Sequence, residues 1–302
     1  MSLYTNNPPK LIPSFVCHVD ILGYAQLCQG AIKSNSSNQF LNKMRDALNA
    51  AYARVRERAK GWNDNNMFEI KVFTDNIVIG YPLKGDFSHT YGEGELGHIF
   101  DVLSEFQLGL AMEGFLVRGG IAIGAHYMDE DIVFGDALIE AVKQDNSGGA
   151  PKVALAPSVI EVLRRHLGFY GDPQWAPQTH DLLQDVDGNV FINYLQGAFI
   201  AFPDGGVFVD VFIKHKETLT KGLIENKGVP SVRAKYEWAA RYHNSVIENF
   251  LKSNPVPTSP DADELYAFAI SEAQVLNEYK IDIESLAAVP HKLNLEPIRP
   301  GT

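Results

Sequence analysis

The order of strand-like and helix-like segments over residues 14–166 limits the fold of this chain more than any other feature. Short β-rich apolar runs are mixed irregularly with longer stretches of helical periodicity. In chain order, the predicted elements are a strand at 14–22, two helices within 24–60, a hairpin at 68–83, a helix at 95–114, strands at 117–125 and 131–135, a helix at 136–146, and a strand, turn and helix within 151–166. This order is neither the strict alternation of a Rossmann sheet nor a run of hairpins. It predicts an α+β protein with a ferredoxin-like mixed sheet and helices packed on one face.

The C-terminal third differs in texture from the part before it. Residues 233–279 contain two helical patterns separated by a proline-rich stretch at 254–263. The tail from residue 290 shows no clear period and is expected to be irregular. We therefore predict a first domain at 1–204 and, packed on it, a C-terminal helical extension at 205–302. The aromatic residues Tyr236, Trp238 and Tyr242 lie in the first of these helical patterns. They are expected to make packing or dimer contacts rather than a platform for base stacking.

Charge and cysteine content argue against several classes of protein. Lys and Arg number 26 against 37 Asp and Glu, which gives a formal net charge of −11. An extended nucleic-acid surface normally carries a basic stripe, so nucleic acid is not an expected partner. The N-terminus lacks the layout of a secretory signal, and no apolar run reaches the ~18 residues of a membrane helix. Because Cys17 and Cys28 form no CxxC pair, neither a disulfide framework nor a cysteine-rich zinc site is expected, and the expected compartment is the cytoplasm.

Two aspartates interrupt segments that otherwise have the composition of buried strands. Asp20 lies in the first strand, within VDILG, and Asp75 lies at the turn of the hairpin, within FTDNIVIG. A buried carboxylate is costly unless it is paired or binds a metal. If the first strand lies beside the hairpin, the two carboxylates meet, and a divalent cation such as Mg²⁺ or Mn²⁺ would relieve their repulsion. The alternative is structural, with Asp75 as a turn residue and Asp20 as a strand-end cap.

Four short motifs occur in an order that is typical of a known family. They are VDILGYAQ at 19–26, KVFTDNIVIG at 71–80, VRGGIAIG at 117–124 and VFGDALIEA at 133–141. Together they resemble the signatures of the catalytic domains of class III nucleotidyl cyclases, which include adenylate and guanylate cyclases. The C-terminal segment with KYEWAARYHN is more similar to the pyrimidine cyclases, uridylate and cytidylate, of the bacterial Pycsar antiphage systems.

The resemblance implies that the chain cyclises a nucleoside triphosphate with two metal ions per site. Asp20, Asp75 and the carbonyl of Ile21 match the positions that hold the two Mn²⁺ or Mg²⁺ ions. The metal lowers the pKa of the ribose 3′-hydroxyl, which attacks the α-phosphate and expels pyrophosphate. Sites of this family lie between two catalytic domains, so the resemblance also implies a homodimer with composite active sites.

The same resemblance assigns residues to the phosphates of the substrate. The turn from Ile21 to Ala25 matches a loop whose backbone N–H groups bind phosphates at a helix start. Gly23 lies inside this turn, Tyr24 stands where the family usually has Phe, and Ala25 stands where it usually has Thr. Arg118 matches the residue that contacts the β- and γ-phosphates. The alternative for Arg118 is a solvated charge at a strand edge.

Other positions depart from the family pattern. Ile139 and Lys143 occupy the places of an Asn and an Arg that act on the ribose and the transition state, and Ile139 cannot donate a hydrogen bond. Lys143 is either a substitute cation or a lysine of the helix surface. The pair that reads the base maps onto Lys71 and Ile132, and a one-residue shift would put Asp131 in place of Ile132. The incomplete purine-reading set agrees with a pyrimidine substrate and also with a decayed enzyme.

The sequence therefore supports one favoured function and three alternatives. The favoured function is a uridylate cyclase, with CTP as the second choice of substrate, whose cyclic product is a signal read by a separate effector protein. The alternatives are a purine nucleotide cyclase, an inactive cyclase-like dimer that binds nucleotides or a protein partner, and a metal-dependent phosphohydrolase. The hydrolase would use His18 and Asp20, which share a strand face, although a histidine satisfied within the core is the preferred interpretation of His18.

Overall fold

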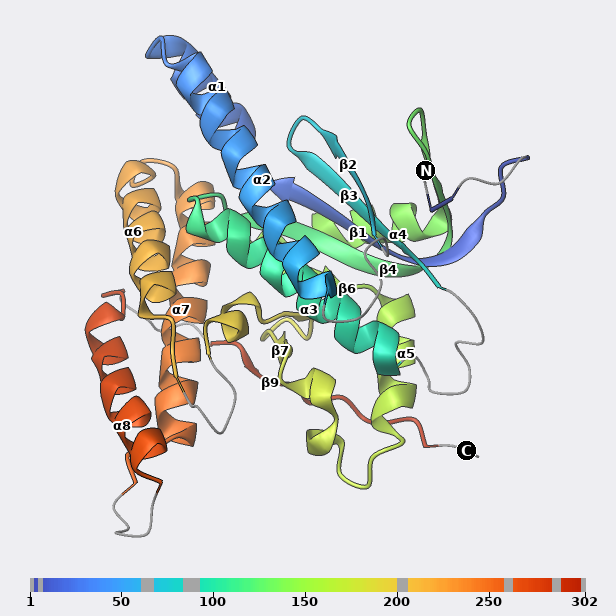
Figure 1. Ribbon diagram of the computed structural model, residues 1–302. Coiled ribbons are helices and arrows are strands. Elements are labelled where there is room, and N and C mark those ends of the chain that lie inside the picture. The colour runs from blue at the N-terminus through green and yellow to red at the C-terminus, as the bar shows by residue number, and fades with distance from the viewer. Residues whose placement is uncertain are drawn as a thin grey trace.

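A mixed sheet runs through the described part of the chain, with helices on both of its faces (Figure 1). The computed structural model describes residues 3–4, 8–60, 68–83, 93–199, 206–257, 263–283 and 289–299. The protein is therefore α+β, as the order of elements predicts. No helix in these ranges is both long enough and apolar enough to cross a membrane.

The elements of the N-terminal half follow the predicted order closely. The strands among the described residues are β1 (Ile12–Ile21), β2 (Glu69–Phe73), β3 (Asn76–Pro82), β4 (Val117–Met128), β5 (Val133–Gly135), β6 (Val153–Leu155), β7 (Leu182–Gln184), β8 (Val190–Ile192) and β9 (His291–Lys292). The α-helices are α1 (Tyr24–Lys33), α2 (Ser37–Lys60), α3 (Glu93–Met112), α4 (Asp136–Gly148), α5 (Pro157–Leu167), α6 (Val209–Glu225), α7 (Pro230–Ser253) and α8 (Glu264–Ala273).

The strand order of the sheet is β2-β3-β1-β4-β6-β8-β7-β9, with β5 paired to β4. The β4–β6 pair is parallel, whereas the other strand pairs of the described residues are antiparallel. The first strand therefore lies at the centre, between the hairpin strand β3 and the glycine-rich strand β4. This placement brings the two motif segments that contain Asp20 and Asp75 side by side, because β1 and β3 are hydrogen-bonded neighbours.

The first face of the sheet carries the main hydrophobic core. Alternate residues of β1, including Phe15 and Cys17, belong to one buried cluster with residues of α2, α3 and α5. The same cluster continues into α6 and α7, for example through Phe212 and Tyr242. The C-terminal helices therefore share one continuous core with the sheet.

The opposite face is covered in part by α4, so the expectation of helices on one face only was wrong. Val16 of β1 and Val78 of β3 form a second buried cluster with Ala137 of α4, and Figure 1 shows α3 in front of the sheet and α4 behind it. Small residues on β4 permit this packing. A Cβ on Gly120 would lie 2.2 Å from the carbonyl oxygen of Ala141, so the α4 backbone is in direct contact with the strand.

The region after α5 contains structure that the sequence patterns did not predict. Strands β7 and β8 are three residues long, and the tail, expected to be irregular, contributes β9, which pairs with β7 through Leu183 and Lys292. Such short strands carry too little period to be recognised. The unpaired edge of β7 provides the backbone partners that order the tail.

Candidate functional site

Three polar residues lie side by side across the centre of the sheet. Asp20, one residue before the end of β1, is the register partner of Asn76 on β3 and of Arg118 on β4. Side chains of residues that are directly opposite in a sheet point to the same face. Asp20 alternates with the core residues Val19 and Ile21, so the polar row points to the face that α4 partly covers.

Asp75 is held next to Asp20 by the turn between β2 and β3. Its carbonyl accepts the backbone N–H of Ile21 at 3.1 Å. Burial and then a hydrogen bond with the Asp75 carboxyl raise the pKa of Asp20. Burial also acts to raise the pKa of Asp75, but hydrogen bonds from Thr74, its own backbone N–H and Asp20 lower it overall. The two carboxyls therefore lie close enough to shift each other's pKa, upward at Asp20 and downward at Asp75.

Arg118 binds the Asp20 carboxylate and also approaches a third acid. Its Nη2 and Nε lie 2.9 and 3.0 Å from Oδ2 of Asp20, and its Nε lies 3.5 Å from Oδ1 of Asp145 on α4. Burial raises the pKa of Asp145, whereas the charges of Arg118, His18 and Lys235 act to lower it. One guanidinium thus interacts with two acids, Asp20 on β1 and Asp145 on α4.

Asp145 is a site residue that the motif comparison missed. It is buried on α4, eight residues after Ala137 and four after Ala141, both of which are also buried. Residues at this spacing share one helix face. The spacing in the sequence therefore already indicated that the buried face of α4 ends in an acidic residue.

His18 lies on the same face as Asp20, as predicted, but it contacts other residues. Its Nε2 is 3.0 Å from Oδ1 of Asn76, and its Nδ1 is 3.7 Å from Oδ2 of Asp145. Asn76 hydrogen-bonds one ring nitrogen, whereas Asp145 only approaches the other. This arrangement agrees better with a structural histidine beside the core than with a His18–Asp20 metal pair.

The loop assigned to the phosphates leads into α1. Gly23 takes a φ of 74°, which few residues other than glycine adopt, and the helix starts at Tyr24 without a side-chain cap. The first N–H groups of a helix have no partner within the helix, so this end can bind an anion. Tyr24 packs at an angle against Phe40, with ring centroids 6.3 Å apart, and Ala25 is exposed. The end of β1 thus joins the Asp20 cluster directly to a helix N-terminus.

The two residues that the resemblance assigns to base recognition lie on β2 and in the turn before β5. Lys71 is on β2, opposite Val78, and its Nζ is buried without a hydrogen-bond partner among the described residues. Ile132 is exposed in the turn before β5, where Asp129 accepts the backbone N–H groups of Ile132 and Asp131, both at 2.9 Å. Lys71 and Asp129 interact electrostatically, which brings β2 and this turn near each other.

Ile139 and Lys143 face away from the cluster of their own chain. Both are exposed on α4, and they are one turn apart on the side opposite the buried Ala141 and Asp145. Ile139 is 58% exposed, which is unusual for an isoleucine in the middle of a helix. The structure therefore does not bring Lys143 to Asp20 or Asp75 within one chain.

The carboxylate pair fits a divalent cation, but only with ligands from outside the protein. In the described ranges, no group of three or more His, Cys, Asp or Glu is arranged to hold a metal ion. Asp20 and Asp75 repel each other when both are ionised, and a cation bound between them would relieve that repulsion. Mg²⁺ usually binds one or two carboxylates and takes its other ligands from water and phosphates. The residues present fit that mode of binding.

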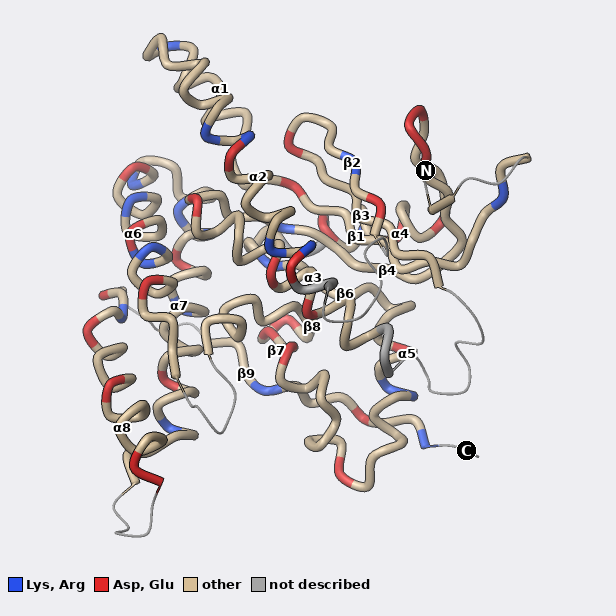
Figure 2. Tube along the Cα trace, viewed as in Figure 1, with Lys and Arg blue, Asp and Glu red and all other residues tan. Residues whose placement is uncertain are grey.

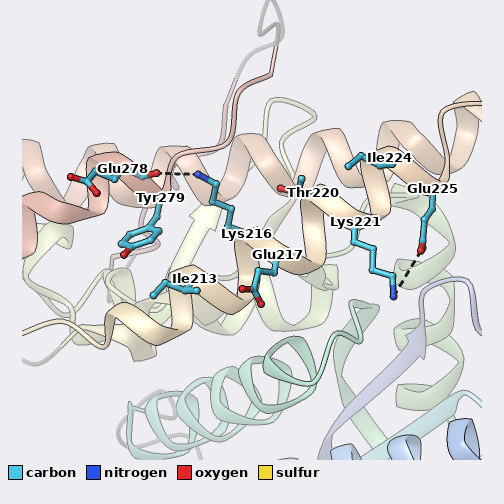
Figure 3. Close-up of a pocket in the computed structure, with 9 residues that line it drawn as sticks. All are labelled: Ile213, Lys216, Glu217, Thr220, Lys221, Ile224, Glu225, Glu278 and Tyr279. Atoms are coloured by element: carbon cyan, nitrogen blue, oxygen red, sulfur yellow. Dashed lines mark hydrogen bonds and ion pairs between the residues drawn. The ribbon is translucent and has the colours of Figure 1, made fainter.

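A cavity of about 680 Å³ lies elsewhere, along the outer face of α6 (Figure 3). Two lysines line it, but Lys216 donates to the carbonyl of Glu278 at 3.0 Å and Lys221 pairs with Glu225 at 3.8 Å. None of its lining residues belongs to the Asp20–Arg118 cluster. Figure 2 shows basic and acidic residues interspersed along α6 and α7, so this surface does not carry a single sign of charge.

Comparisons with known proteins add no family assignment. No protein-family model matches the chain. No curated protein matches it either.

Proposed function

We propose that the protein is a pyrimidine nucleotide cyclase, which converts UTP or CTP to the 3′,5′-cyclic monophosphate and pyrophosphate. The observation that carries the proposal is the closeness of the Asp20 and Asp75 carboxyls at the end of β1, beside Arg118 and the start of α1. Carboxylates, a guanidinium and free helix N–H groups together form a site for a metal-bound triphosphate.

The topology supports the same proposal. Along the chain, β1, the β2–β3 hairpin and β4 are separated by helices. In the sheet, these strands lie in the order β2-β3-β1-β4. Both orders agree with the ferredoxin-like plan. Class III cyclase catalytic domains are built on that plan, and the four sequence motifs fall on its central strands and on α4.

Each residue of the cluster has a separate task in this reaction. Asp20 and Asp75, with the carbonyl of Ile21, would hold two Mn²⁺ or Mg²⁺ ions. When bound, such ions would supply Lewis-acid chemistry that lowers the pKa of the ribose 3′-hydroxyl and neutralises the charge of the phosphates. The N-terminus of α1 binds phosphate oxygens, and Arg118 stabilises the charge that develops on the leaving pyrophosphate. The 3′-oxygen then bonds to the α-phosphorus as the bond to the β-phosphate oxygen breaks.

Arg118 must release Asp20 before it can stabilise the leaving pyrophosphate, because its guanidinium binds the Asp20 carboxylate. When a cation binds Asp20, the carboxylate exchanges one positive partner for another, and Arg118 becomes available to the phosphates. Asp145, 3.5 Å from Arg118, keeps the freed guanidinium from swinging into solvent. Asp145 is thus a positioning residue for Arg118.

The residues near the base favour a pyrimidine. Lys71 offers a buried ammonium without a hydrogen-bond partner among the described residues, and Ile132 offers no polar group to complete a purine-reading pair. A base carbonyl oxygen is the natural acceptor for Lys71; UTP, CTP and GTP carry one and ATP does not, so the choice of a pyrimidine over GTP rests on Ile132.

The direction of α4 supports the proposal of a homodimer. Ile139 and Lys143 point away from their own site, and Phe134 and Ile132 expose apolar surface nearby in the chain. Exposed apolar groups of this kind mark an interaction surface. In a homodimer, this surface would be covered and Lys143 would reach the site of the partner subunit. By resemblance, the product would be an antiphage signal in the cytoplasm, read by a separate effector.

A second candidate is an inactive cyclase-like dimer. It is favoured by the Arg118–Asp20 pair, which occupies the proposed metal ligand, and by Ile139 in place of a hydrogen-bonding residue. The test is incubation of the purified protein with ATP, GTP, CTP and UTP in separate tubes with Mn²⁺, followed by mass analysis. A cyclic pyrimidine monophosphate supports the proposal, and a cyclic purine contradicts the choice of base. Linear mono- or diphosphates indicate a hydrolase, and the absence of any product favours the inactive dimer.

A further inference from the structure

Helix α7, from the C-terminal third of the chain, is held against the sheet by a buried charged cluster. The Nζ of Lys152, next to β6, donates to Asp185 at 2.6 Å and to Asp187 at 2.9 Å. Asp185 also accepts the indole N–H of Trp238 on α7 at 2.8 Å. The side chains of Lys152 and Asp185 are 3% and 5% exposed, so water cannot replace either partner at low cost. The cluster therefore fixes where α7 lies against β6 and the β7–β8 turn.

This cluster lies beside the part of β4 that begins the candidate site. The backbone N–H of Gly119 donates to the carbonyl of Lys152 at 3.0 Å, and Arg118 is the residue before Gly119. Trp238 lies 5.7 Å from the Lys152 ammonium, measured to its ring centroid. Lys235 precedes Trp238 by three residues, so both side chains lie on the same side of α7, about one turn apart.

Electrostatic interactions agree with this placement of Lys235. Burial and then the charge of Arg118 lower the pKa of Lys235, and the charges of Asp20 and Asp145 partly offset that effect. In turn, Lys235 acts on the pKa of Asp145. These effects agree with the position that the helical spacing gives Lys235, on the side of α7 that carries Trp238 and faces the Lys152 cluster.

A further cation, beyond the two metal ions proposed at Asp20 and Asp75, would help the cluster to accept a triphosphate. Asp20, Asp75 and Asp145 are three acids around one guanidinium, and a triphosphate adds more negative charge. An ammonium on a flexible stem can follow a phosphate oxygen as the substrate settles.

We propose that Lys235 binds the phosphates of the nucleoside triphosphate, so that the C-terminal extension completes the active site of its own chain. The inference rests on the proposed function of the Asp20 site. It gives residues 205–302 a direct role in substrate binding rather than a role in packing alone.

The experiment compares the full-length protein with Lys235→Ala, Lys235→Arg and Lys252→Ala. Lys252 is an exposed lysine in the last turn of the same helix and serves as the matched control. Binding of inorganic tripolyphosphate with Mn²⁺ is measured by calorimetry, and KM and kcat are measured with the preferred triphosphate. Thermal unfolding of each variant confirms that it is folded.

We expect Lys235→Ala to weaken tripolyphosphate binding and raise KM by about tenfold, the loss expected for one charge-assisted contact. Lys235→Arg should restore most of the affinity, and Lys252→Ala should bind as the unmodified protein does. Equal binding by Lys235→Ala and the unmodified protein overturns the inference, even if a cyclic product is formed. Failure of the unmodified protein to bind tripolyphosphate overturns it as well. Weakened binding by Lys235→Ala in a protein that forms no cyclic product supports the role of Lys235 and contradicts the cyclase assignment.

Discussion

Arg118 and Asp20 face each other across neighbouring strands, and two nitrogens of the guanidinium bind one carboxylate oxygen at 2.9 and 3.0 Å. The pair lies on the face of the sheet that α4 only partly covers. It links the two functions assigned to the cluster, because Asp20 is the proposed metal ligand and Arg118 is the proposed phosphate ligand. A cation at Asp20 and a phosphate at Arg118 would separate the pair while satisfying both charges.

Asp20→Asn and Asp75→Asn test the carboxylate pair. An amide preserves shape but binds a hard cation poorly, so each change should lower cyclase turnover with Mn²⁺ by more than about 100-fold. Asp46→Asn, at an exposed position of α2, is the matched control and should leave turnover unchanged. Turnover is measured as cyclic product by mass, with circular dichroism as a check of folding. Normal turnover in either Asp20→Asn or Asp75→Asn would remove the metal assignment.

Buried histidines should make stability depend on pH. Burial lowers the pKa of His126 and His243 to about 4, and burial followed by the charge of His243 lowers that of His215. The unfolded chain protonates near pH 6.5, so this stability is complete above that pH and is lost as the pH falls toward about 4.

The measurement is the free energy of unfolding in urea between pH 7 and pH 5. Each of these histidines contributes a slope of up to about 1.4 kcal/mol per pH unit. His243→Gln should reduce the slope, whereas His180→Gln, at an exposed position, should leave it unchanged. A stability that is constant from pH 7 to pH 5 would contradict this account.

Lys152→Met tests the buried cluster that holds α7. The change leaves Asp185 buried without its ammonium partner, which should cost about 3–5 kcal/mol of stability. Lys221→Met removes an exposed partner of Glu225 and should cost less than about 1 kcal/mol. Urea unfolding of the two variants makes the comparison, and similar losses in both would show that the Lys152 cluster does not stabilise the fold.

Gly120→Ala tests the contact between α4 and β4. The added Cβ would lie 2.2 Å from the carbonyl oxygen of Ala141, so α4 must move and Asp145 with it. We expect a loss of about 1–3 kcal/mol by urea unfolding, together with reduced cyclase turnover. Gly30→Ala on α1, where nothing lies within 4 Å, should instead stabilise the protein by about 0.5–1 kcal/mol. Equal effects at both positions would mean that α4 does not pack on Gly120.

Phe134→Glu tests the proposed dimer surface. Phe134 is 63% exposed on β5, and a charge there should weaken association by at least about tenfold, because burial of an unpaired carboxylate is costly. Phe268→Glu on α8, at a similarly exposed phenylalanine, is the control. Sedimentation velocity over a range of concentrations measures the dimer fraction. A dimer that Phe134→Glu leaves intact would place the interface elsewhere.

The sequence predicted the elements of the first 167 residues and two of the acids of the site. Three boundaries could be predicted because they depend on local chemistry. They are the polar break after α1, the hairpin turn at Asp75, and the helix end before Gly114, which takes a φ of 85°. Asp20 and Asp75 stood out for the same reason, since each interrupts an apolar strand.

The tertiary structure decided which distant surfaces meet. Small residues at Gly120 and Ala141 let α4 pack on the second face, which carries Asp145 to Arg118. The Trp238–Asp185 hydrogen bond holds α7 against the segment that follows β7. Periodicity reports which side of an element is buried but not what covers it. The partners of α4 and α7 are set by side-chain size and buried charge on strands far away in the chain, and only the folded structure brings these together.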